Sequence, residues 1–197
     1  MPDRPIAAIE RGLASVGELL AIEGVEVGIA VVGGTALNLL GIVQRTTSDV
    51  DVLAILQSGS DPPEETLVPP DPLPDPLQRA IARVARDFQL PPDWMNTVVG
   101  LQWQTGLPPG LAGRLHWRRY GGLRVGLVDR YDLIFLKLYA SADSGGPTSV
   151  HVQDLLALHP SERDLETAAA WVREQDPTPA FAGILTEVTT YVRQRLG

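Results

Sequence analysis

Short apolar runs and apolar residues at helical spacing alternate along the chain, and together they predict its elements. A short apolar run predicts a strand at 29–32, and a run rich in β-branched residues predicts one at 48–56. Two further strand-like segments are at 114–119 and 123–128. The last two flank a glycine turn and therefore predict a β-hairpin. A further glycine turn follows the first strand and leads into a short helix predicted over 35–40. We expect the four strands to join one sheet.

Apolar residues three or four positions apart predict helices at 77–88, 130–142, 150–158, 161–173 and 179–196. Asp129 is expected to cap the second of these helices, and Ser161, with Asp164 three residues later, to open the fourth. Residues 58–76 are crowded with proline and acidic residues, so we expect an exposed loop there. The simplest arrangement is a core domain at 1–145 with a helical lobe at 146–197 packed on it. The expected fold class is α/β (α+β), a mixed twisted sheet with flanking helices and this C-terminal lobe.

The amino-acid composition bears on the expected cellular location of the protein and on its expected partners. It has 197 residues, a net charge of −8 and no cysteine, which fits a reducing cytoplasm. The longest apolar stretch, 29–43, is shorter than the ~20 residues that a membrane helix needs, and the N-terminus does not begin like a signal peptide. The acidic balance disfavours indiscriminate binding to nucleic acid. We therefore expect a cytoplasmic protein with no membrane partner.

One basic patch stands out against this acidic background. Its arginines are interleaved with aromatic residues, in the set Arg114, His116, Trp117, Arg118, Arg119, Tyr120 and Arg124. Such side chains can hold phosphates and stack on bases. The alternative, which is more usual for a run of charges, is a hairpin with an arginine-rich face toward solvent.

The turn after the first strand predicts a phosphate site. Gly33 and Gly34 let the backbone come close to a ligand, and the first N–H groups of a helix attract an anion. Thr35 would add a hydroxyl donor. The alternative is an ordinary glycine turn.

Two carboxylates follow on the second predicted strand. Asp49 and Asp51 are two residues apart, so on a strand they share a face, with backbone positions roughly 6 to 7 Å apart. Their side chains could converge on one cation, and oxygen ligands favour Mg²⁺ or Mn²⁺. The alternative is an edge strand whose polar face is solvated.

Lys137 is the only lysine in a chain whose other strongly basic residues are all arginine. It lies on a predicted helix that is apolar almost all round, which is typical of a buried helix. A cation there needs an anionic partner, and a triphosphate or the metal-binding carboxylates could supply it. The alternative is a buried stem whose ammonium group reaches water.

Asp154 is a second polar residue on a predicted apolar helix. It would assist as a metal ligand or a general base, or else make a structural contact, for example with His151 three residues earlier.

The order of these motifs resembles the nucleotidyltransferase superfamily related to DNA polymerase β. Gly33 and Gly34, then a helix, then Asp49 and Asp51 on the next strand match its pattern. The closer resemblance is to the AbiEii-type toxins, the MenT toxins and related bacterial nucleotidyltransferases, whose Arg-x-Thr-x-Asp-x-Asp string is reproduced from Arg45 and Thr47 onward. Those groups also carry a lysine and a later aspartate, which here would be Lys137 and Asp154.

The resemblance implies the nucleotidyltransferase fold and transfer of a nucleoside monophosphate from an NTP. Asp49, Asp51, Lys137 and Asp154 would be catalytic, and Asp49 and Asp51 would bind Mg²⁺ or Mn²⁺. The nucleotide would be held by Gly33, Gly34, Thr35, Arg45 and Thr47. The acceptor in the resembled toxins is tRNA or another macromolecule such as a protein, and a cognate antitoxin in a toxin–antitoxin or phage-defence pair is also implied.

Two departures from that pattern leave a second function open. No third carboxylate stands in an unmistakable strand position, and the basic residue often found between the lysine and the later aspartate is missing from residues 140–149. Both favour a catalytically degenerate module that binds a nucleotide or a partner. A dinucleotide-dependent oxidoreductase is disfavoured, because Gly33-Gly34 is not a Gly-x-Gly-x-x-Gly turn.

Overall fold

The computed structural model describes residues 6–58 and 65–197 and divides the chain into two compact units. The first, which we name the sheet unit, comprises Met1–Gln104 and Ala112–Val128. The second, the helical unit, comprises Thr105–Leu111 and Asp129–Gly197. Each unit is described by itself.

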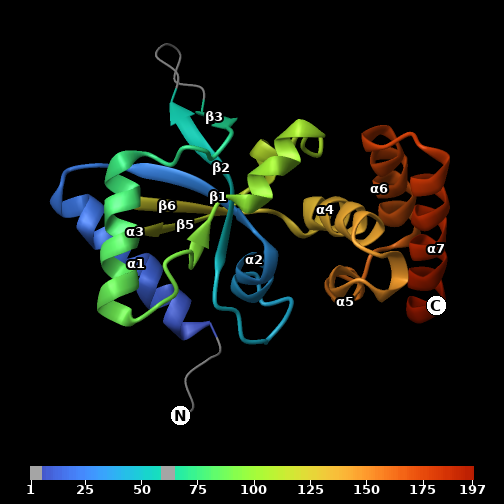
Figure 1. The fold of residues 1–197 in the computed structure, drawn as a ribbon, viewed down its shortest axis with the longest axis horizontal. Coiled ribbons are helices and arrows are strands. Elements are labelled where there is room, and N and C mark those ends of the chain that lie inside the picture. Colours follow the sequence, from blue (N-terminus) through green and yellow to red (C-terminus); the bar gives the residue numbers. More distant parts are fainter. Residues whose placement is uncertain (1–5, 59–64) are drawn as a thin grey trace. The chain divides into compact units, whose positions relative to one another are not determined.

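The sheet unit is built on a mixed sheet (Figure 1). In the described part of the chain its strands are β1 (Val27–Val32), β2 (Val50–Ser58), β3 (Glu65–Val68), β4 (Met95–Asn96), β5 (His116–Tyr120) and β6 (Leu123–Leu127). The order is β3-β2-β1-β6-β5, with β4 also paired to β2. β1 runs antiparallel to β2 and parallel to β6. The four predicted strands and the α+β class are therefore confirmed.

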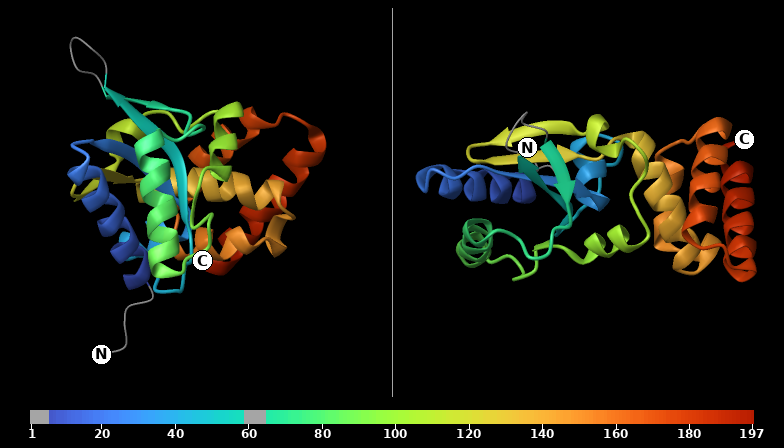
Figure 2. Two further views of the ribbon diagram at one scale, coloured as in Figure 1. Left: turned by 60° about the vertical axis from the view of Figure 1, so that its left-hand side comes forward. Right: turned by 90° about the horizontal axis from the view of Figure 1, so that it is seen from above.

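The α-helices among the described residues of this unit are α1 (Ala7–Ile22), α2 (Gly33–Leu39) and α3 (Asp75–Phe88). α1 and α3 lie side by side (Figure 2) and share one hydrophobic core with β1, β2 and β6. α1 joins this core because Ile9, Leu13, Val16 and Leu20 recur at helical spacing and are fully or almost fully buried. α1 was not predicted from the sequence, although its apolar residues have this helical spacing.

The pairing of β1 with β2 is irregular near its middle. Ala30 faces Ala54 but Val31 faces Val52, so Leu53 is an extra residue in the ladder. The indole Nε1 of Trp103 donates to the carbonyl of Leu53 at 2.8 Å. Trp103 thereby ties the 3₁₀ helix η1 (Val98–Gln104) to the strand that carries Asp51.

The segment predicted as a loop over 58–76 is only partly irregular. Glu65–Val68 forms β3, which pairs antiparallel with β2 at the edge of the sheet. Its Thr-Leu-Val run suits a strand, and prolines are tolerated beside an edge strand because fewer ladder hydrogen bonds are at stake. Residues 59–64 of the predicted loop lie outside the described residues.

The helical unit contains α4 (Arg130–Asp143), α5 (Val150–Ala157), α6 (Glu162–Gln175) and α7 (Pro179–Leu196). The predicted caps are confirmed: Asp129 accepts from the Tyr131 N–H at 2.7 Å, and Ser161 and Asp164 form a capping box. The longer of the two segments of this unit starts at Asp129, and its first helix, α4, packs on α5, α6 and α7. Aromatic rings from α4, α6 and α7 meet in this core, in the set Tyr131, Phe135, Tyr139, Trp171 and Phe181.

Two further 3₁₀ helices, η2 (Leu111–Arg114) and η3 (Gly146–Thr148), complete the described elements. Within residues 6–58 and 65–197, no helix combines the length and the apolar character needed to cross a membrane.

Candidate functional site

Gly33 and Asp51 meet where β1 gives way to α2. Val32 pairs with Asp51 across the sheet, so the next residue, Gly33, lies beside the Asp51 side chain. Gly33 has φ of 71°, and a Cβ at this position would lie 2.1 Å from Asp51 Oδ2. Any other residue would push the carboxylate aside. Glycine here is therefore required both by the backbone conformation and by the approach of the carboxylate.

Gly34 faces the segment that contains Arg45 and Thr47. A Cβ on Gly34 would lie 3.0 Å from Thr47 Oγ1 and 3.7 Å from Arg45 Nη2. Asn38 fixes this approach, since its side-chain amide donates to the Gly34 carbonyl at 2.9 Å and accepts from the Arg45 N–H at 3.2 Å. Sequence reasoning missed Asn38, whose only signal was an amide in an otherwise apolar helix.

Asp49 lies immediately before β2 and is exposed. Its carboxylate accepts a hydrogen bond from Thr47 Oγ1 at 3.1 Å, and its backbone carbonyl accepts one from Thr35 Oγ1 at 2.5 Å. Thr35 is fully buried, so in this structure its hydroxyl places Asp49. The expected role as a donor to a ligand phosphate is replaced by this positioning role.

Asp51 is half-buried between two fully buried valines of β2, Val50 and Val52. Those valines enter the core shared with α1 and α3, so Asp51 points to the opposite face of the sheet. Strand β2 begins at Val50 rather than at 48. The two aspartates are therefore presented by a strand and by the residue just before it.

Asn96 is the second residue that sequence reasoning missed. It lies on β4, which pairs in parallel with β2 so that Asn96 stands opposite Asp51. Its Nδ2 donates to Asp51 Oδ1 at 3.3 Å, and its Oδ1 accepts from the Val98 N–H at 3.2 Å. A neutral amide thus orients the Asp51 carboxylate. The two-residue strand was too short to give a periodic signal.

The donor chemistry of this cluster fits a hard divalent cation. Asp49 and Asp51 supply carboxylate oxygens, and Mg²⁺ is commonly held by one or two carboxylates together with water and substrate phosphate. Throughout the chain as far as the structure describes it, no group of three or more His, Cys, Asp or Glu side chains is arranged to hold a metal ion. Such a cation would therefore rely on the substrate for further ligands.

Lys137 and Asp154 form a buried ion pair within the helical unit. Lys137 Nζ, on α4, lies 2.7 Å from Asp154 Oδ2, on α5, and their side chains are 12% and 4% exposed. The anionic partner expected for Lys137 is thus Asp154. This contact joins the two residues that the resemblance singled out, which lie 17 positions apart in the sequence.

Two arginines of the patch on the hairpin are paired with acidic residues. Arg118 pairs with Glu10 at 3.2 Å and Arg119 pairs with Glu26. The guanidinium of Arg124 stacks over the Trp117 ring, 4.8 Å from its centroid. β5 is nevertheless exposed along most of its length. The structure therefore favours the solvent-facing alternative over a nucleic-acid surface.

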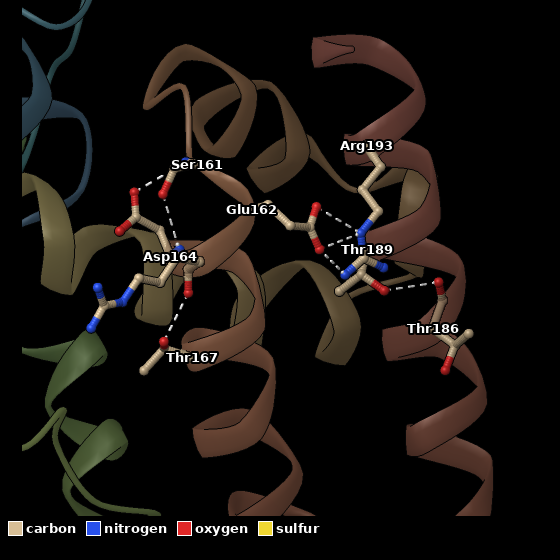
Figure 3. Close-up of polar contacts among 8 residues, drawn as sticks. Ser161, Glu162, Asp164, Thr167, Thr186, Thr189 and Arg193 are labelled. Carbon is tan, nitrogen blue, oxygen red and sulfur yellow. Dashed lines mark hydrogen bonds and ion pairs between the residues drawn. The ribbon is translucent and has the colours of Figure 1, made fainter.

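Polar contacts also join α6 and α7 within the helical unit (Figure 3). Arg193 on α7 donates hydrogen bonds to the Glu162 carboxylate on α6, and its Nε lies 2.9 and 3.0 Å from the two oxygens. This hydrogen bonding lowers the pKa of Glu162. The pair links two helices and brings no chemistry beyond that.

No family model, no curated protein and no solved structure matches this chain in comparisons with known proteins. The function therefore has to be argued from the residues and their geometry.

Proposed function

We propose that the chain is a metal-dependent nucleotidyltransferase, which transfers a nucleoside monophosphate from an NTP to a macromolecular acceptor, a tRNA or a protein. The observation that carries the proposal is the contact of Gly33 with Asp51. A carboxylate occupies the space of a missing Cβ at a glycine of positive φ, with a second carboxylate two residues earlier. This arrangement brings two carboxylates close to the backbone of residues 33 and 34.

In the sheet unit, one group of residues would bind the metal ion and another would bind the phosphates of the NTP. Asp49 and Asp51 would hold Mg²⁺ or Mn²⁺, which, when bound, neutralises phosphate charge and lowers the pKa of an acceptor hydroxyl. Gly33 and Gly34 would let backbone N–H groups approach phosphate oxygens. Thr35, Thr47 and Asn96 would keep the two carboxylates in place through the hydrogen bonds described above.

The ion pair of Lys137 and Asp154 would also take part in the reaction. A lysine ammonium group is a compact charge suited to phosphate oxygens, and Asp154 would hold it in position when no phosphate is present. The resemblance implies catalytic roles for both residues: Lys137 would neutralise charge on phosphate oxygens, and Asp154 would assist as a base.

A catalytically degenerate module is the second candidate, and Asn96 is the observation that favours it. At the position paired with Asp51, a carboxylate would add a third metal ligand, but the chain has an amide. Such a module would bind a nucleotide or a partner without turnover. For the enzyme, the resemblance to AbiEii and MenT toxins suggests a role in a toxin–antitoxin or phage-defence pair, with an antitoxin as a further partner.

The test is transfer of label from each of the four α-labelled NTPs, with Mg²⁺ and total bacterial RNA, or with no added acceptor. The matched variants are Asp51→Ala and Asp87→Ala. Asp87 is an exposed aspartate of α3 that pairs with Arg83 at 3.7 Å, one turn earlier on the same helix.

Label on RNA or on protein with the wild type and Asp87→Ala, but not with Asp51→Ala, would support the transferase. Binding of an NTP with Mg²⁺ but no transfer would select the degenerate module. Equal labelling by wild type and Asp51→Ala would contradict both the site and the proposal.

A further inference from the structure

A cavity in the sheet unit shares a residue with the carboxylate site. It has a volume of about 360 Å³ and lies between residues 71–73, one face of α3 and residues 92–97. We name it the α3 cavity. Residues from all three segments line it, among them Leu73, Gln78, Ile81, Met95, Asn96 and Thr97. Asn96 belongs both to this lining and to the hydrogen bond with Asp51.

The walls of the α3 cavity are held by hydrogen bonds of their own. Gln78 Nε2 on α3 donates to the Leu73 carbonyl at 2.6 Å, which fastens residues 71–73 to the helix. The Trp94 indole, fully buried, donates to the Ile81 carbonyl at 3.4 Å and so fastens the third segment to the same helix. The cavity is therefore formed before any ligand binds, and its volume lies at the small end of the roughly 300–1,000 Å³ of ligand pockets.

The lining residues indicate the chemistry of an occupant. Proline, leucine, isoleucine and methionine side chains suit the apolar faces of a flat ring, while Asp71, Asn96 and Thr97 offer polar groups for its edge. Among the described lining residues there is a carboxylate, Asp71, and no basic side chain. A phosphate is therefore disfavoured, whereas a neutral ring with N–H donors on its edge is favoured, since a carboxylate accepts from an exocyclic amino group.

We propose that the α3 cavity binds a nucleobase that carries an exocyclic amino group, and that Asn96 connects this cavity with the carboxylate site. This inference rests on the proposed function for its setting. The base would come either from the NTP or from the terminal nucleotide of an RNA acceptor. Asn96 would then link occupancy of the cavity to the orientation of Asp51.

The test begins with free nucleosides, measured by calorimetry or by ligand-observed NMR without metal, phosphate or turnover. Cytidine, guanosine and adenosine are expected to bind more tightly than uridine. Ala82→Phe, on an exposed lining position of α3, would fill the cavity and weaken binding by at least about tenfold. The matched control is Ala170→Phe, the same change at an exposed position of α6. Asp71→Asn would remove the preference over uridine.

If transfer is detected, the variant Ala82→Phe also separates the two sources of the base. A raised KM for the NTP alone would place the NTP base in the cavity, and a raised KM for the acceptor alone would place the acceptor's base there. Transfer without nucleoside binding, or binding untouched by Ala82→Phe, would overturn the inference and leave the proposed function standing. Nucleoside binding that Ala82→Phe abolishes, without transfer from any NTP, would support the inference and count against the enzyme.

Discussion

At the scale of single residues, the contact between Gly33 and Asp51 can be separated from the strain of a positive φ. Gly33→Ala and Gly24→Ala place alanine at nearly the same φ, 71° and 69°, but a Cβ at Gly24 would meet nothing within 4 Å. Both variants should lose the roughly 1–2 kcal/mol that a left-handed conformation costs an L-residue. Only Gly33→Ala should also lose nucleotide binding, because its methyl group displaces the carboxylate.

Chemical denaturation and NTP binding measured on both variants would check this prediction. Equal effects of the two substitutions on binding would show that the close approach of Gly33 to Asp51 has no functional part.

Asn96 gives a second prediction at this scale, and it bears on whether the site is degenerate. Asn96→Asp would place a carboxylate opposite Asp51, and like charges on paired residues of neighbouring strands destabilise by up to about 1 kcal/mol. Bound Mg²⁺ should reverse this loss, since a third carboxylate then becomes a ligand. Asn96→Ala removes the same hydrogen bond without adding charge.

Thermal unfolding with and without Mg²⁺ is the measurement. We expect Asn96→Asp to be less stable than the wild type in chelator and to gain more than the wild type from Mg²⁺, with Asn96→Ala gaining no more. If Asn96→Asp gains nothing, the cation does not bind beside Asp51.

Between elements, the contact of α4 with α5 depends on the buried pair of Lys137 and Asp154. Removing one member of a buried pair leaves an uncompensated charge and typically costs about 3–5 kcal/mol. Lys137→Met should therefore destabilise the helical unit by this order, and Lys137→Met combined with Asp154→Leu should recover most of the loss. A double-mutant cycle by denaturant unfolding measures the coupling. Additive losses would mean that the 2.7 Å contact contributes nothing to the packing of the two helices.

The ion pair between Glu162 on α6 and Arg193 on α7 predicts that stability depends on pH. The hydrogen bond from Arg193 lowers the pKa of Glu162, so the folded state holds this carboxylate ionised at a pH where the unfolded chain has begun to bind a proton. The contribution to stability is present above the unfolded pKa of about 4.3 and is lost as the pH falls through the folded pKa. Arg193→Gln should flatten the acid limb of the stability curve compared with the wild type. An unchanged acid limb would mean that the exposed pair is fully screened.

For the whole molecule, the local signals in the sequence were sufficient for most elements and insufficient for the site. The strands β1, β2, β5 and β6, the helix α3 and the helices of the C-terminal half follow from short-range periodicity and caps. Ser161 with Asp164 is a capping box in the structure, as expected. The positions of Asn96 and Asn38 in the site depend on hydrogen bonds to residues that are 45 and 7 positions away in the sequence. No local sequence pattern predicts such bonds. Likewise, the partner of Lys137 becomes visible only once α4 and α5 are packed together.

The last prediction concerns the stability of the whole chain in the presence of ligand. A ligand that binds only the native state stabilises it by mass action, by about 2.7 kcal/mol at a hundredfold excess over its Kd. We therefore expect Mg²⁺ with the preferred NTP to raise the unfolding midpoint of the wild type. Because the net charge is −8, divalent cations also relieve general self-repulsion, and Asp51→Ala measures that non-specific part. Asp87→Ala, which removes one negative charge elsewhere, should behave as the wild type does. If all three proteins shift equally, the gain comes from charge screening, and the pair of Asp49 and Asp51 is a solvated strand end with no metal–nucleotide site.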